Sequence, residues 1–192
     1  GADATINGAS RSLRARAQAV ASVAASYADA VDGEARFPAE AIAEAKAQRL
    51  LGIMVPSALG GEDASIGDVA DVCYTLGQAC ASTAMIYAMH QIKTACIVRH
   101  MRGSATLDRV LHRLCVRQLL LASSTTEGQG GGNVRASEAP IERDGTRISL
   151  ERRATVISYG AQADGIVTTA RRSADAAASD QVLVTLLRDG YT

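Results

Sequence analysis

The sequence predicts an α+β fold in which an all-α N-terminal domain is followed by a β-domain. Up to about residue 117 apolar residues recur at helical spacing, and beyond it short alternating segments are separated by turns. The chain has 192 residues, of which 47% are hydrophobic, enough for a sizeable core. Because the helical patterns precede the strand patterns, we assign residues 1–117 to a helical domain and 118–192 to a partial antiparallel β-barrel or sandwich.

Residues that favour helix ends support the helical part. Pro38 fits the first turn of a helix, where no backbone N–H is needed, and Gly52 can supply the left-handed residue that closes it. Ser65 and Asp68 form a variant of the capping box. Pro56 makes residues 53–56 extended. The expected helices cover residues 10–31, 37–52, 65–77, 83–101 and 104–114.

The second half of the chain is expected to form strands with short turns. A turn is expected at Asp144-Gly145, a polar loop at 171–179, and a glycine-rich loop at 127–133. The expected strands cover residues 118–125, 134–140, 147–150, 155–158, 165–170 and 181–187.

Composition excludes several classes of function. Twenty basic and 20 acidic side chains balance, so the chain has no electrostatic footprint for nucleic acid or an anionic membrane. No apolar run is long enough to span a bilayer, and residues 1–10 carry no visible signal peptide. The four cysteines form no CxxC pair, so we expect no metal site and buried thiols of a cytoplasmic protein.

The stretch before and within the glycine-rich loop is the most distinctive part of the sequence. Hydroxyl groups of residues 123–126 next to glycines can approach a planar or anionic ligand closely, although composition alone favours a flexible hairpin loop. It is not a P-loop, because no lysine follows the glycines. His90 is expected to be a packing residue, and Met85 and Met89 line either an apolar pocket or the core.

Five stretches occur in the order and at the spacings typical of the acyl-CoA dehydrogenase family, which the chain resembles over about residues 10–190. They are Phe37-Pro38, residues 50–56 with Gly60-Gly61, Leu76-Gly77 with residues 81–84, Thr126-Glu127, and residues 156–158 before Ala163-Asp164. The last four are similar, in this order, to the family's "LLGI-VP…GG", "LG…DAST", "TEP-GSD" and "WIT…AD" segments.

The resemblance implies a flavoprotein in which FAD lies against the middle domain and an acyl-CoA thioester is oxidised between its α and β carbons. Thr125 and Thr126 would meet the pyrimidine edge of the flavin, and Ser158 would lie near N5. Val156 would stand at the position of a tryptophan that covers the flavin ring. FAD is therefore the expected cofactor.

The same resemblance implies where the substrate lies. Met85 and Met89 would approach the acyl chain, and Gly132 stands at the serine of the family's Ser-Asp pair, so these three are the expected substrate contacts. The usual catalytic glutamate belongs to the family's C-terminal domain, so no catalytic residue is expected in this chain, and Glu127 is part of the loop.

Three interpretations of the function follow from the resemblance. The first is an FAD-dependent acyl-CoA dehydrogenase whose 192-residue chain is inactive alone and assembles as a homo-oligomer or with a partner that supplies the C-terminal helices. The second is a non-catalytic subunit or fragment that packs on a partner. The third is a flavin-dependent monooxygenase of the same fold.

Overall fold

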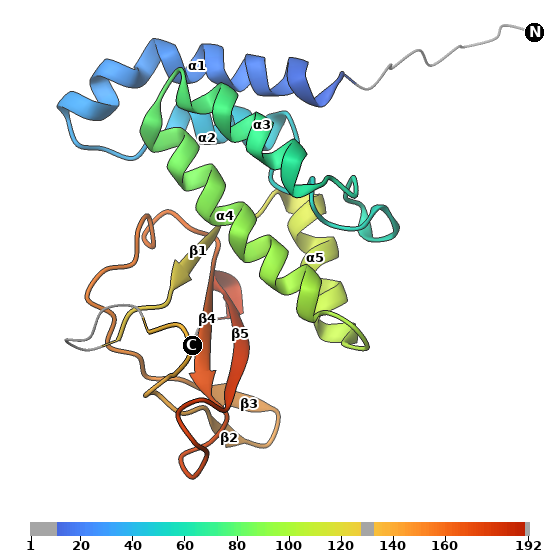
Figure 1. Cartoon of the computed structure of the whole chain (residues 1–192), viewed down its shortest axis with the longest axis vertical. Coiled ribbons are helices and arrows are strands. Elements are labelled where there is room, and N and C mark those ends of the chain that lie inside the picture. The colour runs from blue at the N-terminus through green and yellow to red at the C-terminus, as the bar shows by residue number, and fades with distance from the viewer. Residues whose placement is uncertain (1–10, 128–132, 191–192) are drawn as a thin grey trace, which may run out of the picture.

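The computed structural model describes residues 11–127 and 133–190, and its first part consists of helices (Figure 1). Helix α3 packs against α4 and α1, and α1 also packs against α2, while α5 leads toward the sheet. The helices are α1 (Leu13–Gly33), α2 (Ala39–Ala47), α3 (Ile66–Gly77), α4 (Ala81–His100) and α5 (Ala105–Arg117), with a 3-10 turn at Ser57–Leu59.

The second part contains two small sheets. The larger has the strand order β1-β4-β5 and the smaller is the hairpin of β2 and β3. The strands are β1 (Leu121–Ser124), β2 (Glu142–Asp144), β3 (Arg147–Ser149), β4 (Gly165–Arg171) and β5 (Gln181–Leu187). The α+β fold class is therefore confirmed, with helices first and strands after them.

The pairing of the strands departs from a purely antiparallel sheet. β4 and β5 are antiparallel, as are β2 and β3, but β1 runs parallel to β4 with Leu121 opposite Gly165. Parallel neighbours require a long crossover, and the chain between β1 and β4 supplies it together with the β2–β3 hairpin. The described strands form no closed barrel.

Two helix caps predicted from the sequence are present. The Ser65 hydroxyl accepts the Asp68 N–H at 3.1 Å, and the Asp68 carboxylate accepts the Ser65 N–H at 2.7 Å, which completes the capping box of α3. These bonds to Ser65 hold the pKa of Asp68 below its usual range. Ser104 caps α5 by accepting the Leu107 N–H at 3.3 Å.

The end of α2 differs from the prediction. The helix ends at Ala47, and Arg49, not Gly52, takes the left-handed conformation with φ of 55°. Gly52 instead lies in a turn that continues through Met54 and a bend at Val55, and of residues 53–56 Pro56 has an extended backbone, with ψ of 141°. A Cβ at this position would lie 2.9 Å from the sulfur and 3.3 Å from the Cα of Cys115 on α5, so the close approach of α5 favours glycine there.

Two expected strands are absent from the structure. Residues 134–140 form turns and bends with a single bridge from Pro140 to Arg171, and residues 155–158 lead into a turn closed by Gly160 N–H and the Ile157 carbonyl. Alternation of polar and apolar residues predicted strands in both places. In neither place does a ladder with a neighbouring strand form, so the pattern reflects the partial burial of irregular chain.

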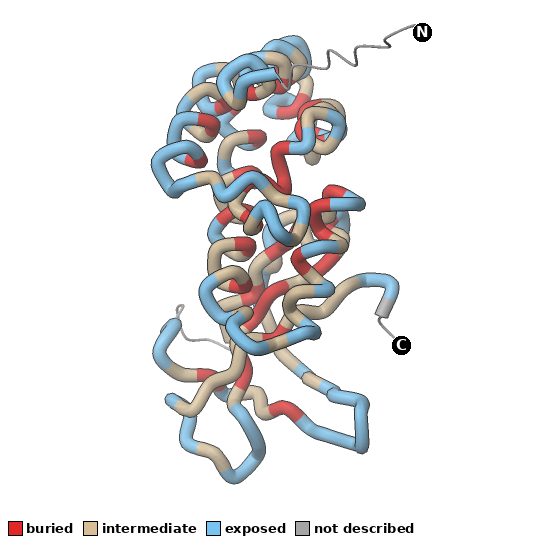
Figure 2. The backbone as a smooth tube through the Cα atoms, turned by 90° about the vertical axis from the view of Figure 1, so that its right-hand side faces the viewer, coloured by how far each residue is buried: buried red, intermediate tan, exposed pale blue. Residues whose placement is uncertain are grey.

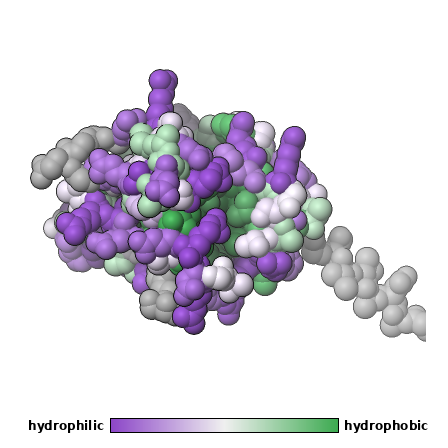
Figure 3. All heavy atoms as spheres, turned by 90° about the horizontal axis from the view of Figure 1, so that it is seen from below, coloured by the Kyte–Doolittle hydropathy of each residue, from purple (hydrophilic) through white to green (hydrophobic). Residues whose placement is uncertain are grey.

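The hydrophobic core lies among the helices and extends from them to the larger sheet. The buried residues, red in Figure 2, concentrate on the inward faces of α1 to α4 and continue through α5 to β1 and β4. Seen from the β-domain end, apolar surface lies in a central depression among hydrophilic side chains (Figure 3). Within residues 11–127 and 133–190, no helix is both long and apolar enough to cross a membrane.

His90 joins α4 to the first strand. Its side chain is fully buried, Nδ1 accepts the Leu121 N–H at 3.0 Å, and Nε2 lies 2.8 Å from the Leu51 carbonyl. Since Nδ1 must be bare to accept, Nε2 carries the proton and donates it to Leu51. The histidine is thus a fully partnered packing residue, as predicted.

A second link joins α2 to the sheet. The Asp164 carboxylate, just before β4, accepts the Lys46 ammonium at 2.9 Å and the Leu120 N–H at 2.8 Å. Together with His90 this bond fixes how the helices sit on the edge of the sheet. The cavity described below lies at this junction.

Candidate functional site

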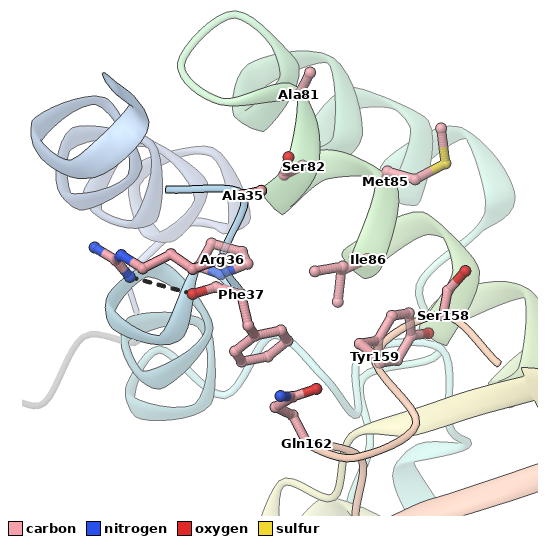
Figure 4. Close-up of a pocket in the computed structure, with 11 residues that line it drawn as sticks. Ala35, Arg36, Phe37, Ala81, Ser82, Met85, Ile86, Ser158, Tyr159 and Gln162 are labelled. Atoms are coloured by element: carbon pink, nitrogen blue, oxygen red, sulfur yellow. Dashed lines mark hydrogen bonds between the residues drawn. The ribbon is translucent and has the colours of Figure 1, made fainter. Parts of the chain in front are cut away.

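A cavity of about 600 Å³ opens where the start of α2, the start of α4 and the turn after Ile157 meet (Figure 4). Phe37, Ile86 and Tyr159 face the same central space, with Gln162 below them. The residues that line the cavity are Ala35, Arg36, Phe37, Pro38, Ala81, Ser82, Met85, Ile86, Ser158, Tyr159 and Gln162.

The cavity brings together two residues that the sequence assigned to different roles. Met85, expected on the substrate side, and Ser158, expected on the flavin side, both line it although 73 positions separate them in the chain (158 − 85). Both side chains are exposed, and Met85, at 62% exposure, lies at the edge of the cavity. An apolar wall and a hydroxyl group thus share one opening.

The turn that carries Ser158 is held in place by Tyr159. The Tyr159 hydroxyl donates to the Leu121 carbonyl at the start of β1 over 2.9 Å, and burial raises the pKa of this phenol. The residue has φ of 44°, in the left-handed region that a bulky side chain rarely adopts. The hydrogen bond and the packing of the ring against the helical core stabilise this conformation.

Arg188 fixes the same turn from the other side. Its guanidinium donates to the carbonyls of Ala163 at 2.9 Å, Gly160 at 2.8 Å and Ala161 at 3.2 Å. The residue follows β5, so the end of the larger sheet holds the backbone of the turn. Ser158 therefore stands on a segment anchored to both edge strands.

The positive charge of Arg36 on the cavity wall is neutralised by neighbouring carboxylates. Arg36 forms two hydrogen bonds with the Glu40 carboxylate, at 2.9 and 3.0 Å, and an ion pair with Glu34 at 3.1 Å. Its guanidinium points away from the centre of the cavity (Figure 4). The bond to Glu40 raises the pKa of Arg36 and lowers that of Glu40. The cavity offers no free cation to an anionic ligand from its described lining.

The other expected site residues lie outside this lining. Thr125 and Thr126 follow β1 and are partly buried, Val156 is 68% exposed, and Met89 is partly buried one helical turn after Met85. Gly132 lies outside the described residues. The structure therefore gathers Met85 and Ser158 in the cavity and leaves the two threonines after β1, outside its lining.

The end of β1 has the chemistry of a flavin-binding edge. Ser124, Thr125 and Thr126 present three consecutive hydroxyls, and the buried Ser124 Oγ has no hydrogen-bond partner among the described residues. The Thr168 hydroxyl donates to the Ser124 carbonyl at 2.6 Å, which fixes the backbone at this point. Uncharged donors and acceptors of this kind suit the polar edge of a flavin ring. The residues present thus fit the cofactor that the resemblance implies.

Glu127 anchors the base of the glycine-rich loop. Its carboxylate accepts the N–H groups of Glu138 at 2.7 Å and Ala139 at 3.1 Å, and pairs with Arg152 at 3.0 Å. The side chains of Glu127 and Arg152 are only 11% and 7% exposed. All of these contacts hold the chain together, so Glu127 has a structural role at this place. The described part of the chain contains no group of side chains arranged to bind a metal.

Sequence reasoning missed Phe37, Tyr159 and Gln162 as site residues. Phe37 belongs to the first of the five stretches that resemble the family, and Tyr159 directly follows Ser158, yet no motif marks either ring as a site residue. The scarcity of aromatic residues could have pointed to them. The chain contains one phenylalanine and five tyrosines, and where aromatic residues are so few, each ring marks a place where large apolar surface is needed.

Comparison with known proteins identifies the helical part of the chain. The family model described as acyl-CoA dehydrogenase, N-terminal domain, matches residues 9–118. A search of curated protein sequences finds no match.

Several solved structures share the fold. FMN-bound TdsC from Paenibacillus sp. A11-2 has a TM-score of 0.78 at 14% identity, covering 92% of this chain and 44% of TdsC. Nitrososynthase from Micromonospora carbonacea var. africana has a TM-score of 0.75 at 22% identity, covering 96% of this chain and 47% of the nitrososynthase. Acyl-CoA dehydrogenase from Geobacillus kaustophilus has a TM-score of 0.72 at 16% identity, covering 92% of this chain and 47% of that enzyme.

The chain spans less than half the length of each of these proteins, and at such identities the likeness shows the fold alone. The family model, in contrast, matches more than half of the 192 residues. The chain belongs to the acyl-CoA dehydrogenase family.

Proposed function

We propose that the chain is part of a flavin-dependent oxidoreductase whose substrate enters the cavity between α2, α4 and the Ser158 turn. The observation that carries the proposal is that Met85 and Ser158 line one opening. The turn of Ser158 is bonded through Tyr159 to Leu121 at the start of β1, and Thr125 and Thr126 follow the same strand. This arrangement puts an apolar substrate wall next to groups that suit a flavin edge. Family membership supports it.

In this proposal the described residues bind and orient, while flavin, when bound, supplies a two-electron acceptor. Thr125, Thr126 and Ser158 would hydrogen-bond the flavin edge, and Phe37 and Tyr159 would exclude water from the substrate. The lining of the cavity, all of it described, contains neither a carboxylate nor a histidine. A carboxylate or histidine base for proton transfer would therefore come from outside this lining.

The substrate and cofactor that we propose first are an acyl-CoA thioester and FAD. The family model and the likeness to an acyl-CoA dehydrogenase from Geobacillus kaustophilus support this choice. Met85 would then contact the acyl part at the mouth of the cavity, while Met89 and Gly132 remain proposed substrate contacts.

A flavin-dependent monooxygenase is the second candidate. It is favoured by the likeness to FMN-bound TdsC, described elsewhere as a dibenzothiophene monooxygenase, and to a methanesulfinate monooxygenase from Pseudomonas fluorescens. Val156 also favours it, since this exposed aliphatic residue takes the position at which the dehydrogenase pattern has tryptophan. In this candidate FMN takes the place of FAD.

An apolar surface on α3 and α4 supports the proposal that the functional protein is an assembly. Ile66, Tyr74 and Ile92 are between 58% and 70% exposed, and Ile66 and Ile92 border an apolar groove of about 320 Å³. Exposed apolar side chains that border a groove often pack against another chain or domain. We propose that a second copy of the chain or further helices cover this surface.

Flavin binding and flavin reduction test the proposal separately. Purified chain is incubated with FAD or FMN, and flavin binding is followed by quenching of flavin fluorescence in the parent, in Ser158→Ala and in the matched control Ser26→Ala on α1. We expect weaker binding only for Ser158→Ala, because Ser26 bonds the Ser22 carbonyl within its own helix. Equal affinities for all three would contradict the role of Ser158.

Reduction distinguishes the two candidates. Under anaerobic conditions an acyl-CoA should bleach the flavin of a dehydrogenase once the complete assembly is present. A monooxygenase should stay yellow with acyl-CoA and bleach with a reduced nicotinamide or a reduced flavin supply. Oxygen consumption that depends on an added aromatic or sulfur compound would decide for the second candidate.

A further inference from the structure

Two of the few aromatic rings in the protein face the same cavity. The chain has one phenylalanine and five tyrosines, and Phe37 and Tyr159 lie on opposite sides of the space that Ile86 also faces (Figure 4). Aromatic rings prefer offset-stacked or edge-to-face contact with other rings. A pair of rings across a gap therefore favours a flat aromatic ligand over an aliphatic one of equal size.

The charges near the wall disfavour an anionic ligand. Arg36 is the only charged residue in the lining, and Glu34 and Glu40 neutralise it, so these three groups together carry one excess negative charge. An anion in the cavity would meet that charge with no free cation to offset it. The remaining polar groups of the lining, on Ser82, Ser158 and Gln162, are uncharged and can bond a neutral substituent.

The rings are held in position before any ligand arrives. The Tyr159 hydroxyl is bonded to the Leu121 carbonyl at 2.9 Å, and its ring packs against the helical core. Phe37 packs against the same core and is followed by the buried Pro38. Side chains that are already ordered lose little freedom on binding, so the contact is efficient.

We propose that this cavity binds a flat aromatic group without negative charge, placed between Phe37 and Tyr159. The proposal rests on the proposed function, in which the cavity is the substrate side of the site, and it names the class of substrate. The cavity volume of about 600 Å³ lies within the range of about 300–1,000 Å³ that small-molecule sites occupy. An acyl-CoA would enter with an aromatic acyl group, and its phosphates would stay outside.

The absence of tryptophan from the sequence makes the test direct. Indole compounds can be excited where tyrosine does not absorb, so their own anisotropy reports binding to the 192-residue chain without flavin. Indole-3-acetamide and indole-3-acetate form a matched pair that differs in charge. We expect the acetate to bind about fivefold more weakly, because the uncompensated negative charge repels it.

A second pair isolates aromaticity. Phenol and cyclohexanol share ring size and a hydroxyl group, and each is measured by its displacement of indole-3-acetamide. We expect phenol to compete at about threefold lower concentration or better, in line with the strength of aromatic pairs. Equal competition by the two alcohols, or equal binding of acetate and acetamide, overturns the proposal.

Variants place the binding in the cavity. Phe37→Leu and Tyr159→Leu should each weaken indole-3-acetamide binding about three- to tenfold. Tyr159→Phe keeps the ring and should retain binding within about twofold. The matched control is Tyr74→Leu on α3, where the tyrosine is 70% exposed and outside this cavity, and it should bind as the parent does. A loss for Tyr74→Leu as large as for Phe37→Leu overturns the proposal.

The outcome is separate from that of the flavin experiment. A chain that fails to bind flavin but discriminates phenol from cyclohexanol defeats the proposed function and supports an aromatic-binding cavity. A chain that binds flavin through Ser158 and treats the two alcohols alike defeats only this inference. Far-ultraviolet circular dichroism of each variant shows that the helices are intact before binding is measured.

Discussion

His90 is expected to make the stability of the protein sensitive to mild acid. The ring is fully buried between α4, the turn at Leu51 and the start of β1. Burial lowers the pKa of His90 to about 4 from the ordinary value of 6.5, and the nearby Lys46 and Asp164 act in opposite directions. Protonation would also place a hydrogen on Nδ1 against the Leu121 N–H, where an acceptor is required.

The sign of the effect follows from the lowered pKa. Above pH 6.5 the histidine is neutral in both folded and unfolded chains, so its full contribution to the free energy of unfolding is present. As the pH falls from 6.5 toward 4 the unfolded chain binds a proton that the folded chain does not, and stability is lost. With 1.36 kcal/mol for each pKa unit, the whole loss is about 3 kcal/mol, of which about 2 kcal/mol falls between pH of about 7 and about 5.

The variant His90→Asn tests this reasoning. The asparagine can still accept the Leu121 N–H, while the Leu51 carbonyl keeps a weak bond from the Gln91 amide at 3.4 Å. We expect the free energy of unfolding to fall by about 1–3 kcal/mol near neutral pH, because one buried hydrogen bond is lost. The additional loss on acidification should be smaller in the variant by about 2 kcal/mol.

The assay is urea unfolding followed by circular dichroism at the two pH values, with His100→Asn as the control. His100 lies on the same helix but is exposed, bonding only the Cys96 carbonyl at 2.7 Å among the described residues. Its variant should follow the parent at both pH values. If His90→Asn and the parent lose the same stability on acidification, the buried neutral histidine is not the cause and the reasoning is refuted.

Three further substitutions have predictable effects on unfolding by urea. Gly61→Ala should cost roughly 2–4 kcal/mol, because its Cβ would overlap a backbone carbonyl, and an unchanged midpoint would count against that packing. Arg152→Met should cost about 3 kcal/mol by leaving the Glu127 carboxylate buried without its cation, and adding Glu127→Gln should recover much of the loss in a double-mutant cycle. Tyr159→Phe should cost about 1 kcal/mol for the lost bond to the Leu121 carbonyl, and a larger loss would show that the hydroxyl does more than hold the turn.

Local signals in the sequence predicted much of the fold. The capping box at Ser65 and Asp68 and the serine cap at Ser104 are short-range interactions, and the structure contains them as expected. The predicted strands at 165–170 and 181–187 lie side by side as β4 and β5, because both combine apolar residues with clear turns at their ends.

The failures share a physical cause, since they depend on partners far away in the chain. Gly52 looked like a helix end, but what requires glycine there is the approach of Cys115, which no local pattern reveals. Residues 155–158 alternate like a strand, yet they find no strand to pair with in the described structure. The parallel pairing of β1 with β4 likewise depends on the path of the chain between them.

The candidate site could be predicted only in part for the same reason. The resemblance to the family pointed to Met85 and Ser158, and the structure places both in one cavity. Phe37 comes from a segment almost 50 positions before Met85 (85 − 37 = 48), and nothing local connects it to either residue. Pockets assembled from three distant segments become visible only once the packing of the helices on the sheet is known.

The most direct test of the account is to map where flavin binds. Amide NMR spectra of the labelled chain are recorded with and without FAD or FMN, after gel filtration has shown whether the yellow cofactor stays with the protein. The account predicts retained flavin and shifted signals for Thr125, Thr126 and Ser158, with those of α1 unchanged. A colourless protein, or shifts confined to residues away from the end of β1 and the cavity, would contradict it.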